Sequence, residues 1–330
     1  MLEKDDLKDI GFYTLEDGRA RGASTTSPLW RCELILTPAC NFSCPYCRPI
    51  RKDYRETLTL HRAKFIVSGW ASHGLRNVRF SGGEPTLWWG LPHLVRHARE
   101  SGIQRIAIST NGSSSWPVYE ELLAAGVNDF SVSLDACCSS TGDKMAGGVS
   151  GAWNTVVENI RKLAERTYVT VGVVATEDNV AELAETVRLA SEDLGVADIR
   201  VIPAAQWDRP LEEILAVSEE TKAKHPILRY RLSGARRIRG MTPEDSGTCR
   251  LVLDDMAVSG NGHFPCIIYL REQGDPIGSI DGKTMGEIRE ERQKWAFGHD
   301  TRTDPICQKN CLDVCVTYNN KAASFHRGEV

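Results

Sequence analysis

The feature that most constrains the fold of this chain is a regular alternation of strand and helix patterns between residues 31 and 205. Apolar, β-branched segments such as RIAIST and YVTVGVVAT alternate with segments such as LPHLVRHARESG, whose apolar residues recur at helical spacing. We count six such strand–helix steps, which include the predicted helices AWNTVVENIRKLAER and NVAELAETVRLASED. A further helix is predicted after the last step, at LEEILAVSEETKA. Strands joined by helices of this length form right-handed βαβ units with a parallel sheet. The pattern predicts an α/β fold, two steps short of a closed eightfold barrel.

Most of the predicted strands end in polar or glycine-bearing segments. These are the cysteine-containing loop 40–47, SGGEP at 81–85, STNG at 109–112, SLD at 133–135 and VIPA at 201–204. The carboxyl ends of parallel strands lie at one edge of the sheet, where such folds bind ligands. We therefore expect a ligand site built from these five segments.

The loop 40–47 carries three cysteines in the spacing C-x3-C-x2-C, at Cys40, Cys44 and Cys47. Four cysteines usually hold a cubane iron–sulfur cluster, so three would leave one iron open. A structural zinc site needs four nitrogen or sulfur ligands, and no histidine lies in or just after the loop. A disulfide framework conflicts with the length of 330 residues and the odd count of 11 cysteines. The loop predicts a metal centre with one open position.

The other strand ends supply candidate ligand-binding groups. Gly82 and Gly83 permit close backbone approach to a ligand, and Glu84 is a candidate to pair with an ammonium group, directly or through its backbone. The alternative is a simple strand-to-helix turn. Hydroxyl, amide and carboxylate groups suited to a ribose and a carboxylate follow at Ser109, Asn111, Ser133 and Asp135. Asn and Asp are also ordinary turn residues in such positions.

A second group of five cysteines lies near the C-terminus, at Cys249, Cys266, Cys307, Cys311 and Cys315. Four thiolates can hold zinc or an iron–sulfur cluster, so one of the five is spare or has another role. Given an iron–sulfur centre elsewhere in the chain, we favour a second cluster. The segments RLVLDDMAV and HFPCIIYL, joined by SGNG, predict a β-hairpin that brings its two end cysteines together. Cys32, Cys137 and Cys138 are predicted to pack as small, buried or half-buried hydrophobes.

Charge and hydropathy exclude some classes of protein. The net charge of −4 gives no reason to expect attraction to a nucleic acid backbone. The sequence contains no run of about 18 apolar residues, which argues against a membrane span. The charged start MLEKDDLKDI does not resemble a secretory signal. We therefore expect a cytoplasmic protein with neither a membrane nor a nucleic acid as partner.

These motifs resemble those of the radical S-adenosylmethionine enzymes, which carry C-x3-C-x-aromatic-C followed by GGEP. The match runs from about Arg31 to Ala205. The resemblance implies a partial (β/α)6 TIM-like barrel in which the three loop cysteines hold a [4Fe–4S] cluster, whose open iron chelates S-adenosylmethionine. It also implies the cofactor-binding positions: Tyr46 near the adenine, Gly82, Gly83, Glu84 and Pro85 near the methionyl ammonium, Ser133 and Asp135 near the ribose or carboxylate, and the backbone of Ile202 and Pro203 near the adenine.

The same resemblance implies the chemistry. One electron would enter the sulfonium of S-adenosylmethionine, and the resulting 5′-deoxyadenosyl radical would abstract a hydrogen atom from a substrate. An electron donor such as flavodoxin or ferredoxin would be needed as a partner.

The C-terminal part is similar to the auxiliary-cluster domains called SPASM and twitch. Their opening, a cysteine, a hairpin, and a glycine a few residues before a second cysteine, is matched by Cys249, Gly262 and Cys266. The later cysteines are too few for the full SPASM pattern. The similarity implies a small α+β domain in which four of the five cysteines hold a single second [4Fe–4S] cluster. Which of Cys307, Cys311 and Cys315 is not a ligand stays open.

We expect four regions: an N-terminal extension at 1–30, the partial barrel at 31–205, a bridging segment at 206–245 and the auxiliary-cluster domain at 246–330. The expected function is modification of a peptide or protein. One alternative is oxidation or epimerisation of a small carbohydrate-like molecule, and another is a non-catalytic iron–sulfur sensor or scaffold. One family member, from the molybdopterin pathway, also carries a second cluster and ends in Gly-Gly. This sequence ends in HRGEV, so we do not expect that activity. Candidate proton acceptors or substrate anchors are Asp254, Asp255 and Arg200.

Overall fold

The computed structural model describes residues 18–207, 209–233 and 237–328. Six parallel strands form most of the sheet: β1 (Arg31–Ile35), β2 (Asn77–Ser81), β3 (Arg105–Thr110), β4 (Asp129–Ser133), β5 (Tyr168–Ala175) and β6 (Asp198–Pro203). Neighbouring strands in the chain are neighbours in the sheet. The predicted α/β fold with a parallel sheet is confirmed.

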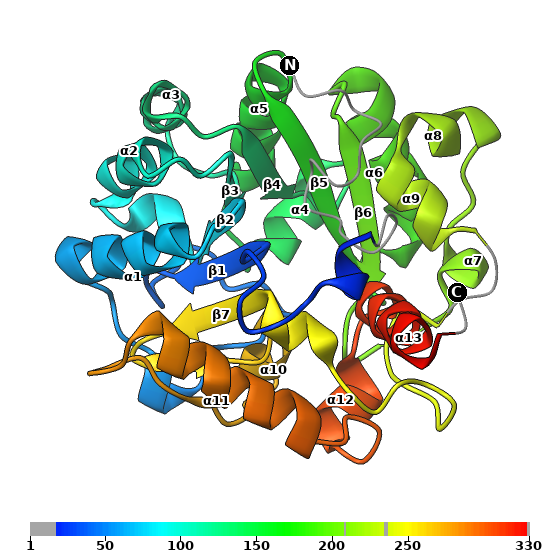
Figure 1. The fold of residues 1–330 in the computed structure, drawn as a ribbon. Helices are drawn as coiled ribbons and strands as arrows, with labels where there is room; N and C mark the ends of the chain where they lie inside the picture. Colours follow the sequence, from blue (N-terminus) through cyan, green and yellow to red (C-terminus); the bar gives the residue numbers. More distant parts are fainter. Residues whose placement is uncertain (1–17, 208, 234–236, 329–330) are drawn as a thin grey trace.

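Helices follow the strands and cover the outer face of the sheet (Figure 1). The barrel helices are α1 (Leu60–Ser72), α2 (Leu91–Glu100), α3 (Trp116–Ala125), α4 (Ser139–Met145), α5 (Ala152–Ala164) and α6 (Leu183–Arg188). Short turns of helix also occur, at η1 (Gly18–Arg21), η2 (Lys52–Tyr54), η3 (Pro85–Leu87) and η4 (Val180–Glu182), and a π-helical turn, η5 (Leu189–Asp193), continues α6. The segment NVAELAETVRLASED, predicted as one helix, is therefore three successive pieces.

The bridging region and the C-terminal region are also largely helical. They contain α7 (Leu211–Ile214), α8 (Glu219–Lys224), α9 (Pro226–Arg231), η6 (Arg250–Leu253), α10 (Ile267–Arg271), α11 (Met285–Gly298), α12 (Pro305–Asn310) and α13 (Asp313–Arg327). The stretch LEEILAVSEETKA, predicted as one helix, forms α7 and α8. Ser218 separates them because its side chain caps the start of α8 by accepting from the amide of Thr221.

The predicted C-terminal hairpin is shorter than expected. Its strands are β7 (Asp255–Ser259) and β8 (Gly262–Phe264), and a third short strand, β9 (Gly278–Ser279), pairs with β8. Pro265 lacks an amide hydrogen for the ladder, and Cys266 begins α10 by accepting from the amide of Tyr269 at 3.4 Å. The strand pairing therefore stops before the second cysteine.

The C-terminal hairpin extends the barrel sheet. Strand β7 pairs in parallel with β1, as Figure 1 shows, so the order is β6-β5-β4-β3-β2-β1-β7-β8-β9. Arg31 and Asp255 are partners in this register, and their side chains form an ion pair at 3.2 Å. The C-terminal region thus shares a sheet with the barrel, which brings its cysteines to the open side of the barrel.

The two faces of the sheet differ in character. Alternate residues that point outward pack under the helices in one apolar core, which includes Val78, Phe80, Ile106, Ile108, Val169 and Val171. The residues between them point inward and are often charged: Glu33 and Arg79, for example, are register partners on β1 and β2. Because side chains alternate along a strand, the inner face can be polar while the outer face builds the core.

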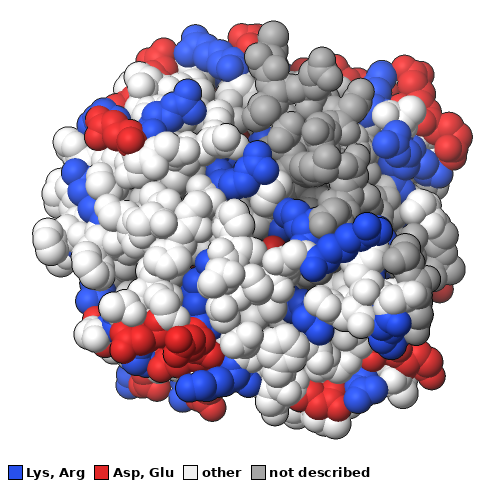
Figure 2. Space-filling view, in the orientation of Figure 1, with Lys and Arg blue, Asp and Glu red and all other residues white. Residues whose placement is uncertain are grey.

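The outer surface carries charges of both signs. On the face drawn in Figure 2, basic side chains recur near the centre and acidic ones gather toward the margin. In the described part of the chain, no helix combines the length and the apolar character needed to span a membrane.

Candidate active site

The cysteine loop and the GGEP segment are packed directly against each other. The amide of Gly83 donates to the carbonyl of Thr37 at 2.7 Å, and the amide of Glu84 donates to that of Ala39 at 2.7 Å. A Cβ atom would lie 2.4 Å from the oxygen of Thr37 if built on Gly82, and 2.2 Å from that of Ala39 if built on Gly83. Both positions therefore require glycine, and the two segments form one unit.

Glu84 stabilises this unit from behind. Its side chain is fully buried, and its carboxylate accepts hydrogen bonds from the amide and hydroxyl of Thr86, the hydroxyl of Thr110 and the amide of Asn111, at 2.5–3.0 Å. Burial raises the pKa of Glu84, while these hydrogen bonds act in the opposite direction. The carboxylate links the ends of β2 and β3. The carboxylate therefore already accepts hydrogen bonds from four protein donors, while the backbone of the same residue faces the cysteine loop.

The three loop cysteines line one cavity of about 450 Å³ at the carboxyl ends of the strands. Of the predicted cofactor residues, those on its wall are Tyr46, Gly82, Gly83, Ser109, Asn111, Ser133 and Ile202. Four others do not line this cavity: Glu84, Pro85, Asp135 and Pro203. The structure thus brings most of the predicted set together around Cys40, Cys44 and Cys47.

The three loop thiols do not lie close enough together to bind one zinc ion as they stand. In the described residues, two groups of three candidate ligands have all their ligand atoms within 4.8 Å of one another, and the loop cysteines belong to neither. Thiolates on one tetrahedral zinc would stand only about 3.8 Å apart, given a Zn–S bond of about 2.3 Å. Burial raises the pKa of Cys40, and that of Cys44 to about 12 with help from the Asp135 carboxylate.

Tyr46 and Asp135 connect the cysteine loop to the next strands. The Tyr46 hydroxyl donates to Asp135 Oδ2, and the other carboxylate oxygen accepts from the amide of Val174 at 2.7 Å. The side-chain amide of Asn179 donates to the backbone oxygen of Asp135 at 2.7 Å. Burial raises the pKa of Asp135 to about 6. Asp135 therefore orients Tyr46, and its carboxylate has protein partners where the resemblance implied a ribose or carboxylate contact.

A second cavity, of about 270 Å³, lies between the inner face of the sheet and the C-terminal helices. Its wall contains all five C-terminal cysteines: Cys249, Cys266, Cys307, Cys311 and Cys315. The two cavities have four residues in common: Ser109, Ile202, Ile267 and Ile268. The two cysteine groups, more than 200 residues apart in the sequence, therefore line two adjoining cavities.

The five C-terminal thiols are partly buried and lie close enough to influence one another. Burial raises the pKa of Cys249 to about 11 and that of Cys266 to about 12, and the neighbouring thiol of Cys315 adds to both shifts. The side-chain amide of Asn319 donates to Cys249 Sγ at 3.4 Å. Cys307 also belongs to a tight group with His299 and Asp304. The five thiols thus line one cavity.

The charged side chains on the wall of the second cavity are Arg31, Glu33, Arg79, Arg200, Arg231 and Asp255. Arg200 and Asp255 were candidates from the sequence, whereas Asp254 lies outside this wall and forms an ion pair with Arg19 at 3.2 Å. Sequence reasoning missed Glu33 and Arg79. A signal was present, because each is a charged residue between two apolar ones: Glu33 follows Cys32 and precedes Leu34, and Arg79 lies between Val78 and Phe80.

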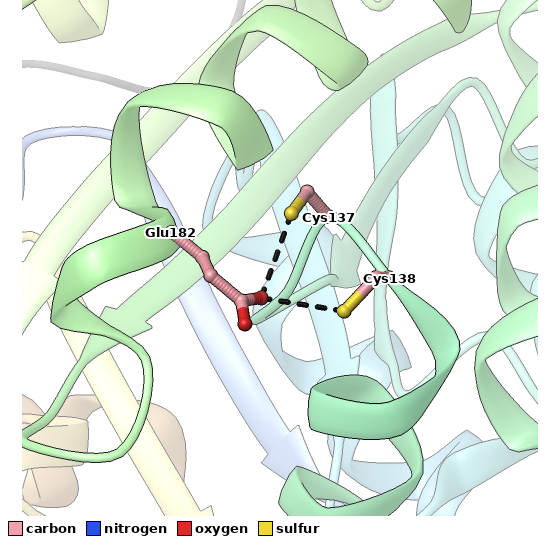
Figure 3. Close-up of side chains that lie close together, drawn as sticks. All are labelled: Cys137, Cys138 and Glu182. Atoms are coloured by element: carbon pink, nitrogen blue, oxygen red, sulfur yellow. Dashed lines mark hydrogen bonds between the residues drawn. The ribbon is translucent and has the colours of Figure 1, made fainter.

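Cys137 and Cys138 are more than packing residues. Both thiols donate to Glu182 Oε2, at 3.5 and 3.6 Å, and all three side chains converge in Figure 3. Burial and Glu182 raise the pKa of Cys137 to about 11, whereas a hydrogen bond with Ser140 lowers the pKa of Cys138. This cluster could not be predicted from local sequence patterns, because Glu182 is 44 residues from Cys138. Cys32 is fully buried, as expected.

Comparison with known proteins agrees with this geometry. Residues 34–190 match the family model described as the Radical SAM superfamily. A GTP 3′,8-cyclase of Alkaliphilus oremlandii is 30% identical over 238 residues, which cover 66% of this chain and 74% of that protein. A probable GTP 3′,8-cyclase of Metallosphaera sedula is 28% identical over 224 residues, covering 62% of this chain and 70% of the relative.

Solved structures share the fold. Streptococcus suis SuiB bound to the precursor peptide SuiA has a TM-score of 0.59 and 16% identity, and the match covers 80% of this chain but 65% of the SuiB chain. The structure of anSMEcpe with bound AdoMet has a TM-score of 0.56 and 15% identity, with 90% of this chain and 95% of that chain covered. At these identities the likeness concerns the fold alone.

Proposed function

The chain belongs to the radical SAM superfamily, and we propose that it acts on a small molecule held in the cavity between the barrel and the five C-terminal cysteines. The proposal takes the alternative of a small-molecule substrate over the peptide substrate first expected from the sequence. The single observation that carries it is the shared wall of the two cavities, which places the second cavity directly beside the cofactor site.

The residues around Cys40, Cys44 and Cys47 fit the cofactors of the superfamily. A [4Fe–4S] cluster with S-adenosylmethionine, when bound there, would supply a one-electron cleavage that yields a 5′-deoxyadenosyl radical. Gly82 and Gly83 present their backbone to this cavity. The apolar side chains of the shared wall help to exclude water, which a radical reaction needs so that hydrogen is taken only from the substrate.

The size of the second cavity favours a small substrate. At about 270 Å³ it is slightly smaller than typical pockets for small ligands, which start at about 300 Å³, so it has no room for a folded protein. The named relatives, GTP 3′,8-cyclases, are called after a small-molecule substrate. A nucleotide or a phosphorylated or carboxylated sugar is therefore a better first candidate than a folded protein.

Modification of a peptide is the second candidate. Cys40 and Cys47 are exposed, so the cofactor cavity is open on one side. A peptide side chain that enters from that side would reach the cofactor without filling the second cavity. The peptide-bound SuiB structure shares the fold but at 16% identity adds no argument on substrate.

We further propose that four of the five C-terminal cysteines hold a second [4Fe–4S] cluster in a twitch-like arrangement. Their burial and their common cavity support this assignment. The centre would accept an electron from the substrate or contact the substrate directly. A flavodoxin or ferredoxin would deliver the electron that starts the reaction.

The first experiment measures cofactor cleavage. Anaerobically reconstituted protein, reduced with dithionite, should convert S-adenosylmethionine to 5′-deoxyadenosine and methionine, as measured by liquid chromatography and mass spectrometry. The variant with Cys40, Cys44 and Cys47 all changed to alanine is the matched control. If iron-loaded, reduced wild-type protein forms no 5′-deoxyadenosine, the protein is a non-catalytic iron–sulfur sensor or scaffold.

The second experiment addresses the substrate class. GTP, other nucleotides and sugar phosphates would each be added, and in parallel a mixture of peptides. Small anionic molecules should raise 5′-deoxyadenosine formation above the substrate-free rate. Stimulation by peptides alone would favour the second candidate.

A further inference from the structure

We propose that Arg200 binds an anionic group of the substrate and that Glu33 accepts a hydrogen bond from a hydroxyl or ammonium group of the same molecule. This inference rests on the proposed function and specifies its substrate: a small molecule with a phosphate or carboxylate close to a hydrogen-bond donor. Both residues lie on the wall of the second cavity.

Arg200 lies beside a glycine that leaves room for its side chain. It stands on β6 beside Gly172 of β5, its register partner. A Cβ atom on Gly172 would lie 3.2 Å from Arg200 Nη2, so the missing side chain leaves room for the guanidinium to lie across the neighbouring strand. From there Arg200 donates to the hydroxyl of Ser131 on β4, at 3.4 Å. The glycine thus allows the arginine to reach into the second cavity.

The charge of Arg200 is not matched by a close acidic partner. No carboxylate in the described part of the chain forms an ion pair with it, and its buried Nε has no hydrogen-bond partner there. Burial, together with the charges of Arg79 and Arg231, lowers the pKa of Arg200 to about 10. A guanidinium with one long hydrogen bond, a buried Nε without a partner and no carboxylate close by is costly, and a bound anion would reduce that cost.

The other arginines on the wall of the second cavity differ in how closely a carboxylate pairs with them. Arg31 pairs with Asp255 at 3.2 Å, and Arg231 pairs with Asp313 at 2.5 Å. Arg79 donates to the hydroxyl of Ser109 at 2.9 Å. The carboxylate nearest to Arg79, that of Asp129, is 3.8 Å away and lies closer to Arg105, at 3.2 Å. Arg79 and Arg200 are therefore the pair best placed to share an anion.

Glu33 is the opposite case, a carboxylate without a donor. It is 7% exposed, and within the described residues it makes no hydrogen bond or ion pair. The Glu33 carboxylate acts to raise the pKa of Arg200, and both side chains line the second cavity. An ionised carboxylate only accepts hydrogen bonds. A substrate that places a hydroxyl or ammonium group here would satisfy Glu33 while its anionic group satisfies Arg200.

The position of this charge pair links it to the reaction. Ser109, the acceptor for Arg79, belongs to both cavities. A molecule bound to Arg79 and Arg200 therefore lies against the wall of the cofactor cavity. Its atoms near this wall would be the ones exposed to hydrogen abstraction.

The test uses reconstituted holoenzyme and two phosphate probes of similar size. Phosphoethanolamine carries a phosphate and an ammonium group, and ethyl phosphate carries the phosphate alone. β-Alanine and propionate form the matching pair for a carboxylate. Binding would be measured by equilibrium dialysis, and iron content and circular dichroism would report the folding of each variant.

Four variants separate the roles. Arg200→Met should weaken binding of both phosphate probes by about 10- to 100-fold, as expected for a hydrogen-bonded charge. Gly172→Ala should weaken binding by less, because the added methyl group requires the end of the guanidinium to shift by only a few tenths of an ångström. Glu33→Gln should bind ethyl phosphate at least as well as wild type but lose most of the preference for phosphoethanolamine. Arg161→Met, on the exposed surface of α5, is the matched control and should bind as wild type.

The outcomes distinguish the two proposals. If wild-type protein forms 5′-deoxyadenosine but binds none of the four probes, or binds them equally with Arg200→Met and Arg161→Met, the anion site is refuted. An undiminished preference for phosphoethanolamine in Glu33→Gln would refute the role of Glu33. Absence of 5′-deoxyadenosine in the wild type would refute the proposed function, whatever the probes do.

Discussion

The Cα atom of Gly83 lies so close to the carbonyl oxygen of Ala39 that a Cβ atom there would be 2.2 Å from it. Real carbon and oxygen atoms do not approach this closely, and the neighbour is backbone that cannot rotate away. The contact fixes the distance between the GGEP segment and the cysteine loop. Any side chain at this position must push the two apart.

We expect Gly83→Ala to lower iron incorporation at the cysteine loop and to reduce 5′-deoxyadenosine formation by more than about tenfold, since small misplacements in an active site cost about this much or more. Iron analysis and product assay on the same sample would measure both effects. Gly298→Ala is the control, because a Cβ atom there meets nothing within 4 Å. Equal activity of the two variants would contradict the assigned contact.

Glu84→Gln should destabilise the folded protein by about 1–3 kcal/mol, because an amide group cannot accept at both ends and would face the amide of Asn111 with its own donors. Thermal unfolding followed by circular dichroism measures the loss. Glu158→Gln, on an exposed position of α5, should unfold like the wild type. An unchanged melting temperature in Glu84→Gln would show that the carboxylate does not link β2 and β3.

Asp198 should make stability fall as pH rises. Its carboxylate is fully buried, and burial raises its pKa to about 7, from about 3.9 in the unfolded chain. Between these values the unfolded chain releases the proton and the folded protein keeps it, so rising pH favours unfolding. Above about pH 7 both states are ionised and the loss is complete.

Asp198→Asn keeps an acceptor for the amides of Ile199 and Ile227 and cannot ionise. Its stability relative to wild type should therefore increase from about pH 4 to about pH 7 and then level off, by about 1.4 kcal/mol for each unit of pKa shift. Denaturant unfolding at several pH values would measure the difference. A difference independent of pH would contradict the raised pKa.

Removal of the loop cysteines tests the second cluster. The variant with Cys40, Cys44 and Cys47 changed to alanine should retain about four irons per chain after reconstitution, since the C-terminal cysteines remain. Adding Cys249→Ala and Cys266→Ala should remove the rest. Zinc in place of iron, or no metal in the first variant, would refute a second iron–sulfur centre.

The adjacent thiols Cys137 and Cys138 should differ in reactivity. Because the thiolate is the reactive form, the lowered pKa of Cys138 and the raised pKa of Cys137 predict alkylation at Cys138 first. Iodoacetamide treatment of the holoenzyme at neutral pH, followed by peptide mass spectrometry, would give the order. Ser140→Ala should slow the reaction at Cys138, and faster labelling of Cys137 would contradict the assignment.

Local pattern was sufficient for much of the fold. Strands such as β3 and β5 and helices such as α2 and α5 lie close to their predicted positions, because each has the period of its own structure. Boundaries failed where a single side chain decided them. Ser218 divides a predicted helix, and Pro265 with Cys266 ends a predicted strand.

The candidate site divides in the same way. The sequence by itself determined the cysteine loop, the GGEP segment and the polar strand ends, because these contacts are made by residues at fixed positions in a repeated strand–loop–helix unit. Only the tertiary structure decided that β7 joins β1, that Glu84 and Asp135 bind protein groups, and that Arg200 and Glu33 line one cavity with the C-terminal cysteines. These relationships join residues up to more than 200 positions apart, and they depend on side-chain direction and burial, which local periodicity does not specify.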